Sequence, residues 1–240
     1  MSVVVGCHQP NFLPWLGFFA KVARSDVFFL LDDVQFTQGA NKHNWTSRVR
    51  IGTNNGPHWL SLPVRRSGIG LQLIVDLRTD DTLRWLPKML STLESSYRKA
   101  PYADASLPRI IRSLSEHQGS VCETNVRLIR DICAMLNLKT KLICSSERPV
   151  SGAATERLVN LTLSESGTTY LSGDGADDYQ VVDQFEEAGI EVRKLGFQPQ
   201  PYPQRRGLEF VPGLSIVDAL CYIGIEATLK LIEKPEAQRE

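Results

Sequence analysis

The sequence has no excess charge, no long apolar run and no paired-cysteine motif, and each absence excludes a class of protein. Its 240 residues contain 27 Lys and Arg against 27 Asp and Glu, so the net charge is zero. Without a global field, we expect no nucleic-acid partner. No apolar stretch approaches the roughly 18 residues that a membrane span needs, and the N-terminus lacks the basic region of a signal peptide.

Cysteine is sparse and follows no recognised pattern. The five cysteines are Cys7, Cys122, Cys133, Cys144 and Cys221, and no two have C-x-x-C spacing. An odd number in a chain of this length argues against a disulfide framework and for a reducing compartment, so we predict a cytoplasmic protein. H-x-x-x-H spacing is also missing. We therefore expect neither a metal nor a cofactor.

The composition that remains is that of an ordinary globular protein, with 42% hydrophobic and 22% charged residues. Short apolar runs predict strands at 3–6, 27–31, 141–144, 169–172 and 190–195. Helical periodicity between them favours an α/β fold with a mixed, partly parallel sheet flanked by helices.

The middle of the chain has a helical texture. Amphipathic spacing predicts helices at 83–97, 107–118 and 125–135. We expect a single domain over residues 1–240, in which the segment of about 83–138 would form a helical sub-lobe. Before this segment, the pattern predicts a strand pair at 48–51 and 59–64 around an Asn-Asn-Gly-Pro turn, and a further strand at 74–77.

Polar residues cluster just after the first two predicted strands. His8-Gln9-Pro10-Asn11 follows the first strand, and Asp32-Asp33-x-Gln35 follows the second. If these strands are parallel neighbours, both loops open onto the edge of the sheet where ligands bind. His8 would then be a general base that Asp32 or Asp33 orients. In the alternative interpretation, His8 pins the proline loop and the aspartates cap a turn.

Two other chemistries could use these residues. Cys7 adjoins His8, but neighbours in an extended chain point apart, which favours a small buried residue over a nucleophile. A metal site of His8, Asp32 and Asp33 would lack any recognised ligand spacing.

Two further segments suit an anion. Arg48 and Arg50 share one face of a predicted strand and could hold a phosphate or carboxylate, or could form a solvated edge. Ser172-Gly173-x-Gly175, with Tyr179 beyond, follows a later strand, where glycine lets backbone N–H groups approach an anion. This segment is not a G-x-G-x-x-G motif, and it predicts nucleotide binding only weakly.

Long motifs resemble the WbqC-like family in their order and spacing. They are His8 to Phe18, Ser25 to Phe28, Leu31 to Phe36, Trp45 to Ile51, Trp59 to Val64, Tyr170 to Tyr179, Tyr202 to Gln204 and Leu214 to Asp218. The resemblance implies a cytoplasmic biosynthetic protein, encoded with O-antigen or other surface-polysaccharide genes or with secondary-metabolite genes. It also implies a transferase that forms an amide by moving an acyl or aminoacyl group onto an amine, such as an amino sugar.

A thioester would be the natural donor for such a transfer, because it already stores the energy of the bond. The expected partners are a small-molecule or nucleotide-sugar acceptor and an acyl-carrier protein. Substrate contacts are expected from the residues near the first site, the arginine pair and the glycine loop. They are Gln9, Asn11, Trp15, Gln35, Arg48, Arg50, Ser172, Gly173, Gly175 and Tyr179.

The alternative is a non-catalytic protein that holds a nucleotide-linked sugar or a carrier protein for another enzyme. Gln9, Asn11, Asp33 and Trp15 would then be a sugar-binding set.

Overall fold

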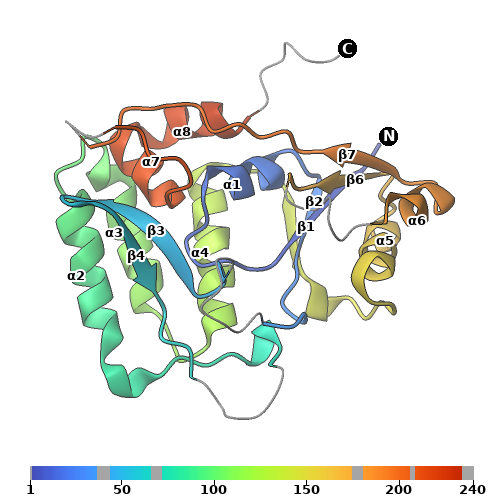
Figure 1. Ribbon diagram of the computed structural model, residues 1–240, viewed down its shortest axis with the longest axis horizontal. Coiled ribbons are helices and arrows are strands. Elements are labelled where there is room, and N and C mark those ends of the chain that lie inside the picture. The colour runs from blue at the N-terminus through green and yellow to red at the C-terminus, as the bar shows by residue number, and fades with distance from the viewer. Residues whose placement is uncertain (1, 37–43, 66–71, 175–180, 206–208, 234–240) are drawn as a thin grey trace.

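A computed structural model describes residues 2–36, 44–65, 72–174, 181–205 and 209–233. Its centre is a parallel five-stranded sheet in the order β5-β2-β1-β6-β7 (Figure 1). The strands are β1 (Val4–His8), β2 (Val27–Leu30), β5 (Lys141–Cys144), β6 (Thr169–Ser172) and β7 (Glu191–Lys194). The predicted α/β class is confirmed. The first two strands are parallel neighbours, and His8 lies opposite Leu30.

A short helix, α1 (Leu16–Ala23), connects β1 to β2 and lies tightly against them. All of its residues except the last are buried, so it is a core helix rather than an amphipathic one. Gly6 in β1 makes this close packing feasible. A Cβ added there would lie 2.5 Å from the Ser25 Oγ and 2.9 Å from the Phe28 ring.

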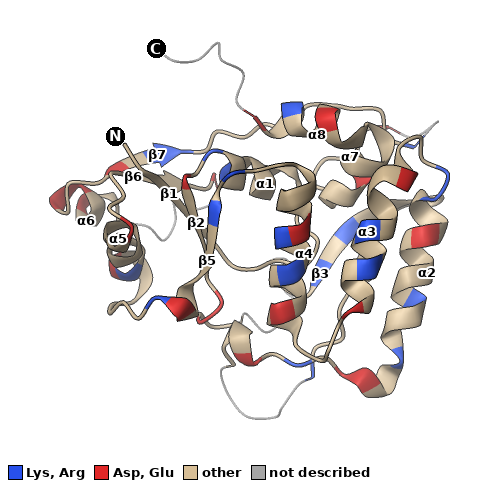
Figure 2. Ribbon diagram, turned by 180° about the vertical axis from the view of Figure 1, so that it is seen from behind, with Lys and Arg blue, Asp and Glu red and all other residues tan. Residues whose placement is uncertain are grey.

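Three helices form the middle of the chain, as predicted: α2 (Trp85–Tyr97), α3 (Ala103–Ser115) and α4 (Val121–Met135). Helix α3 begins four residues before its predicted start, because Ala103 and Ser106 continue its buried face and Pro108 is tolerated inside it. Figure 2 shows Lys and Arg interspersed with Asp and Glu along these helices, in keeping with the zero net charge.

The predicted strand at 74–77 is wrong. A single turn of 3-10 helix, η1 (Ile74–Asp76), occupies this place. Ile74 and Leu77 are buried while Val75 and Asp76 are exposed, and this spacing of three suits a turn of helix rather than the alternation of a strand.

The predicted strand pair is confirmed as an antiparallel hairpin of β3 (Arg48–Thr53) and β4 (Gly56–Ser61), separate from the main sheet. Gly56 takes the left-handed conformation that the turn needs, at φ 94°. The hairpin lies beside α2 in Figure 1 and forms a second, smaller layer of the fold.

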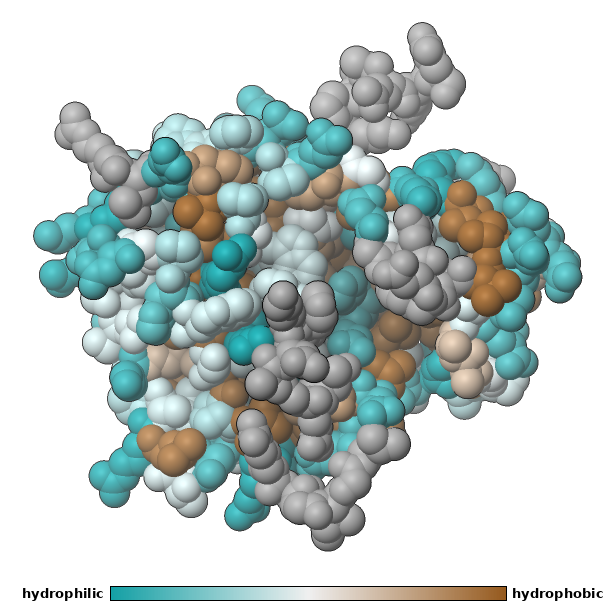
Figure 3. All heavy atoms as spheres, viewed as in Figure 1, coloured by the Kyte–Doolittle hydropathy of each residue, from teal (hydrophilic) through white to brown (hydrophobic). Residues whose placement is uncertain are grey.

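Four helices complete the second half: α5 (Ala154–Ser164), α6 (Val182–Glu187), α7 (Ile216–Tyr222) and α8 (Gly224–Ile232). Ser215 caps α7, and its Oγ accepts from the Val217 N–H at 3.3 Å, as its position predicts. The part of the chain that the structure describes contains no helix long and apolar enough to cross a membrane. On the face shown in Figure 3, the apolar patches are separated by hydrophilic surface.

Candidate functional site

A cavity of about 790 Å³ lies at the carboxyl ends of β1 and β6, the edge of a parallel sheet where ligands are expected. The loop after β1 and one side of α1 form one wall. Helix α5, the strand β6 with the loop after it, and the segment between β7 and α7 contribute most of the rest, together with Leu31, Val34 and Trp45. His8, Gln9, Asn11, Trp15 and Gly173 line it, so the structure brings together these predicted site residues.

The loop from His8 to Trp15 is held by long-range contacts. Asn125, fully buried in α4, donates through Nδ2 to the carbonyls of Pro10 at 2.8 Å and Thr46 at 2.7 Å. Ser215 donates to the carbonyl of Leu13 at 2.8 Å. Leu13 itself is in the left-handed region at φ 41°, a conformation that persists only when its surroundings enforce it.

His8 is a neutral imidazole with one nitrogen turned to a backbone partner. Its Nδ1 lies 3.0 Å from the carbonyl oxygen of Gln9. Because a carbonyl can only accept, Nδ1 carries the proton and Nε2 keeps a free lone pair. Burial and the charge of Lys21 lower the pKa of His8 to about 4, and the Gln9 carbonyl offsets this only in part.

Asn11 supplies an unpaired acceptor to the same wall. Its side chain is 1% exposed and its Nδ2 lies 3.5 Å from Nδ1 of His8. Its Oδ1 is buried and has no hydrogen-bond partner among the described residues. A buried amide oxygen left unpaired is costly, and Asn11 is one of the residues that line the cavity.

Lys21 of α1 is a cavity residue that the sequence interpretation missed. Its side chain is buried, and Nζ donates to the carbonyl of Cys7 at 2.8 Å. Burial lowers the pKa of this ammonium to about 8. A signal was present, since Lys21 is the one charged residue in the apolar helix LGFFAKVA.

The two aspartates lie at the end of β2 but bond away from the cavity. Asp32 accepts from Ser145 Oγ at 3.1 Å, Ser146 N at 2.9 Å and Ser146 Oγ at 2.6 Å. Asp33 accepts from Ser145 Oγ at 2.5 Å and forms an ion pair with Arg157. Of these residues, Arg157 lines the cavity, so Asp33 is connected to the cavity only through its ion pair with Arg157.

The remaining residues near these strands take structural positions. Gln35 is exposed and forms an isolated β-bridge with Leu73. Cys7 is 4% exposed, and burial raises the pKa of its thiol to about 12, which keeps it protonated and poorly nucleophilic. Within the described residues, no three His, Cys, Asp or Glu side chains gather so as to hold a metal ion.

The arginine pair lies on one face of β3, outside the cavity lining. Arg48 and Arg50 alternate with buried Val49 and Ile51. The Arg48 guanidinium lies 4.6 Å from the centre of the Trp59 ring, and Arg50 donates through Nη2 to the carbonyl of Pro212 at 3.0 Å.

Three tryptophans connect this face to the cavity. The Trp15 and Trp45 rings, which line the cavity, are 5.1 Å apart, and the half-exposed Trp59 ring lies 5.6 Å beyond Trp45. We call Trp15, Trp45 and Trp59 the tryptophan strip. It offers apolar ring faces from the cavity to the surface.

In the later glycine loop, Ser172 is buried at the end of β6 and Gly173 lines the cavity. Gly175 and Tyr179 lie outside the described residues. Asp174 accepts from the backbone N–H groups of Gly196 at 2.7 Å and Phe197 at 3.1 Å, which ties this loop to the end of β7.

Comparisons with known proteins show the family of the chain. A family model described as the WbqC-like protein family matches residues 9–230, and the chain belongs to that family. The uncharacterized protein Rv1507c of Mycobacterium tuberculosis is 34% identical over 224 residues, which cover 91% of this chain and 93% of that protein.

Proposed function

We propose that the cavity is the active site of a biosynthetic transferase, which moves an acyl or aminoacyl group from a thioester to an amine. One observation carries the proposal. His8, Asn11 and Lys21 line one cavity, and the Oδ1 of Asn11 has no hydrogen-bond partner among the described residues. A lone pair and an amide oxygen suit the N–H groups of an amine, and an ammonium suits a carbonyl oxygen.

The reaction needs little more than positioning and proton transfer. The amine nitrogen attacks the thioester carbonyl, the C–N bond forms and the C–S bond breaks, and the thiolate leaves. In the tetrahedral intermediate the attached nitrogen is more acidic than the free ammonium, which helps the neutral Nε2 of His8 to take its proton. The same imidazolium can return the proton to the departing thiolate, so the products are the amide and a free thiol.

The tryptophan strip supports an acceptor that contains a ring, such as an amino sugar. Aromatic side chains bind through large apolar faces, and Trp15 and Trp45 present theirs inside the cavity. Arg48, stacked on Trp59, would reach a phosphate of a nucleotide-linked acceptor at the outer end of the strip. The thioester would come from a small carrier or an acyl-carrier protein.

A second candidate is a binding protein that holds such a ligand for another enzyme. The carboxylates of Asp32 and Asp33 favour it, since both bond to Ser145 rather than to His8, and no acid then orients the imidazole.

A transfer assay with a plugged cavity tests the proposal. The protein is mixed with acyl and aminoacyl thioesters of N-acetylcysteamine and with glucosamine, and amide products are measured by mass spectrometry. In Gly173→Leu, the added Cβ would lie 3.9 Å from Lys21 Nζ, so the side chain should enter the cavity without disturbing the backbone. Ser91→Leu adds the same group to the exposed surface of α2 as the control.

We expect wild-type protein and Ser91→Leu to form amide and Gly173→Leu to lose at least tenfold in rate. Equal rates in all three would place the chemistry outside the cavity. Binding of glucosamine to the wild-type protein without any product would favour the binding protein instead.

A further inference from the structure

Lys21 is a buried cation whose surroundings satisfy it only in part. Its side chain is 4% exposed, and within the described chain its one hydrogen bond goes to the Cys7 carbonyl. An ammonium has three donors and no acceptor, so two remain for other partners. The Tyr170 ring, with its centre 5.7 Å from Nζ, gives a weaker electrostatic contact.

No carboxylate among the described residues forms a direct ion pair with Lys21. The ion pairs that they form involve other lysines and arginines, or His117. Because the Cys7 thiol is neutral, Asp174 is the acid whose charge acts on Lys21, and it does so without an ion pair, since its oxygens accept from Gly196 and Phe197. A buried charge without a counter-ion is expensive, and the cost falls when a ligand supplies the missing anion.

We propose that Lys21 is the oxyanion-binding residue of the cavity, which holds a negatively charged substrate oxygen. Resting on the proposed transfer, this oxygen is the thioester carbonyl oxygen, which becomes an oxyanion when the amine attacks. Two different residues thereby serve the attacking nitrogen and the carbonyl oxygen. His8 and Lys21 take the proton and the negative charge, respectively.

The two residues also support each other electrostatically. The charge on Lys21 is one of the causes that lower the pKa of His8, so it keeps the imidazole neutral and its lone pair available. Among the described residues, four groups face the ammonium: Cys7 and His8 from β1, Tyr170 from β6, and Asp174 just beyond β6. With the Lys21 pKa at about 8, the cation is the main form at pH 7 and is lost as the pH rises through 8.

The direction of the pH dependence separates this role from that of a general base. An oxyanion-binding lysine must be protonated, so anion binding and turnover should fall above pH 8. A lysine acting as the base must be deprotonated, so turnover would rise over the same range.

A binding experiment tests the proposal without requiring turnover. Butyrate and its neutral analogue butyramide are titrated into wild-type protein, Lys21→Met and the surface control Lys139→Met, with calorimetry at pH 7. We expect wild type and Lys139→Met to prefer butyrate, and Lys21→Met to lose at least tenfold in butyrate affinity while binding butyramide unchanged. Equal butyrate affinity in wild type and Lys21→Met, or no butyrate binding by wild type, overturns the proposal.

The wild-type protein alone gives a second measurement, in case Lys21→Met does not fold. Butyrate stays ionised between pH 7 and 9.5, so its affinity should fall at least tenfold there, whereas that of butyramide should not change. A flat butyrate profile contradicts the proposal. Failure of the transfer assay would count against the proposed function alone, and intact transfer by Lys21→Met would count against Lys21 alone.

Discussion

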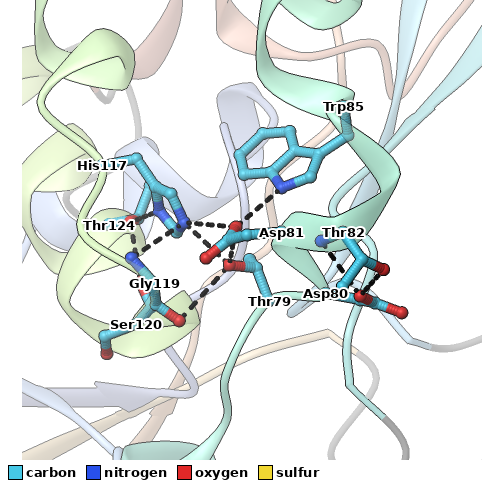
Figure 4. Close-up of polar contacts among 9 residues, drawn as sticks. All are labelled: Thr79, Asp80, Asp81, Thr82, Trp85, His117, Gly119, Ser120 and Thr124. Carbon is cyan, nitrogen blue, oxygen red and sulfur yellow. Dashed lines mark hydrogen bonds and ion pairs between the residues drawn. The ribbon is translucent and has the colours of Figure 1, made fainter.

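His8 and His117 are two buried histidines with opposite surroundings. Burial is the largest cause of the low pKa of each. In His117, Nδ1 lies 2.7 Å from Thr124 Oγ1, and Nε2 accepts from Gly119 N at 3.0 Å and lies 2.8 Å from Thr79 Oγ1 (Figure 4). In His8, which lines the cavity, Nδ1 is the ring nitrogen that has such a partner among the described residues. A low pKa therefore does not by itself mark a functional histidine, and an unused ring nitrogen on a cavity wall is the sharper criterion.

The neighbourhood of His117 also has the residue types of a catalytic site, with an aspartate and hydroxyls around an imidazole. Thr79 donates to Asp81 at 2.7 Å, and Trp85 Nε1 donates to the same carboxylate at 3.1 Å. These bonds join the turn η2 (Asp81–Leu83) to the start of α2 and to the connection between α3 and α4. Both ring nitrogens of His117 have partners among the described residues, which favours a stabilising role for the network.

The largest expected difference between the two histidines is in transfer activity. His8→Ala removes the proton acceptor, and we expect the rate to fall about 10²- to 10⁴-fold with little change in melting temperature. His117→Ala should keep the rate per folded molecule within about threefold. Measured kcat values for both variants, normalised to folded protein, check this. Comparable losses in the two would remove the distinction.

Stability should respond in the opposite sense. His117→Ala leaves the Gly119 N–H and the Thr124 hydroxyl without their buried partner, and we expect a loss of about 2 kcal/mol in the free energy of unfolding. His58→Ala, on the exposed strand β4, is the control and should change stability by less than about 0.5 kcal/mol. Urea unfolding of both variants measures the difference. If His117→Ala matched the control, the network would not stabilise the fold.

The sequence predicts the location of the cavity better than its chemistry. The apolar strands before His8 and Asp32 are short and local, and their parallel pairing follows from the short helical connection between them. The partners of Asp32 come from η3 (Ser145–Glu147), more than a hundred residues away, so no local sequence pattern predicts them. Lys21 was missed for a related reason. An apolar helix is expected in the core, and its sequence does not show where its one charged side chain points.

The pH dependence of stability gives a smaller effect that both histidines should share. The folded state lowers the pKa of each below the ordinary value of about 6.5, so the unfolded chain binds more protons. Their stabilisation is complete above pH 6.5 and is lost as the pH falls below it, for His8 down to about pH 4. Each contributes at most about 1.4 kcal/mol per pH unit in that window.

Variants separate the effect of the histidines on stability from that of Asp218. Burial raises the pKa of Asp218 to about 6, so its contribution to stability changes with pH in the opposite direction. Urea unfolding at several pH values between 4 and 7 should show a flatter profile for His8→Gln than for wild type. An unchanged slope would mean that His8 keeps an ordinary pKa in the folded protein.

The smallest expected effect comes from the exposed side of the His117 network. Trp85→Phe removes the Nε1–H bond to Asp81 but keeps an aromatic ring against His117, where the two ring centres are 4.9 Å apart. The Asp81 side chain is 61% exposed, so water can replace the lost donor and we expect a change of no more than about 0.5 kcal/mol. The pKa of Asp81 should rise, because the Trp85 bond is one of the causes that lower it. Urea unfolding and an NMR titration of the carboxylate measure the two quantities. A loss as large as that of His117→Ala would show that the network acts as one cooperative unit, in which the exposed bond matters as much as the buried imidazole.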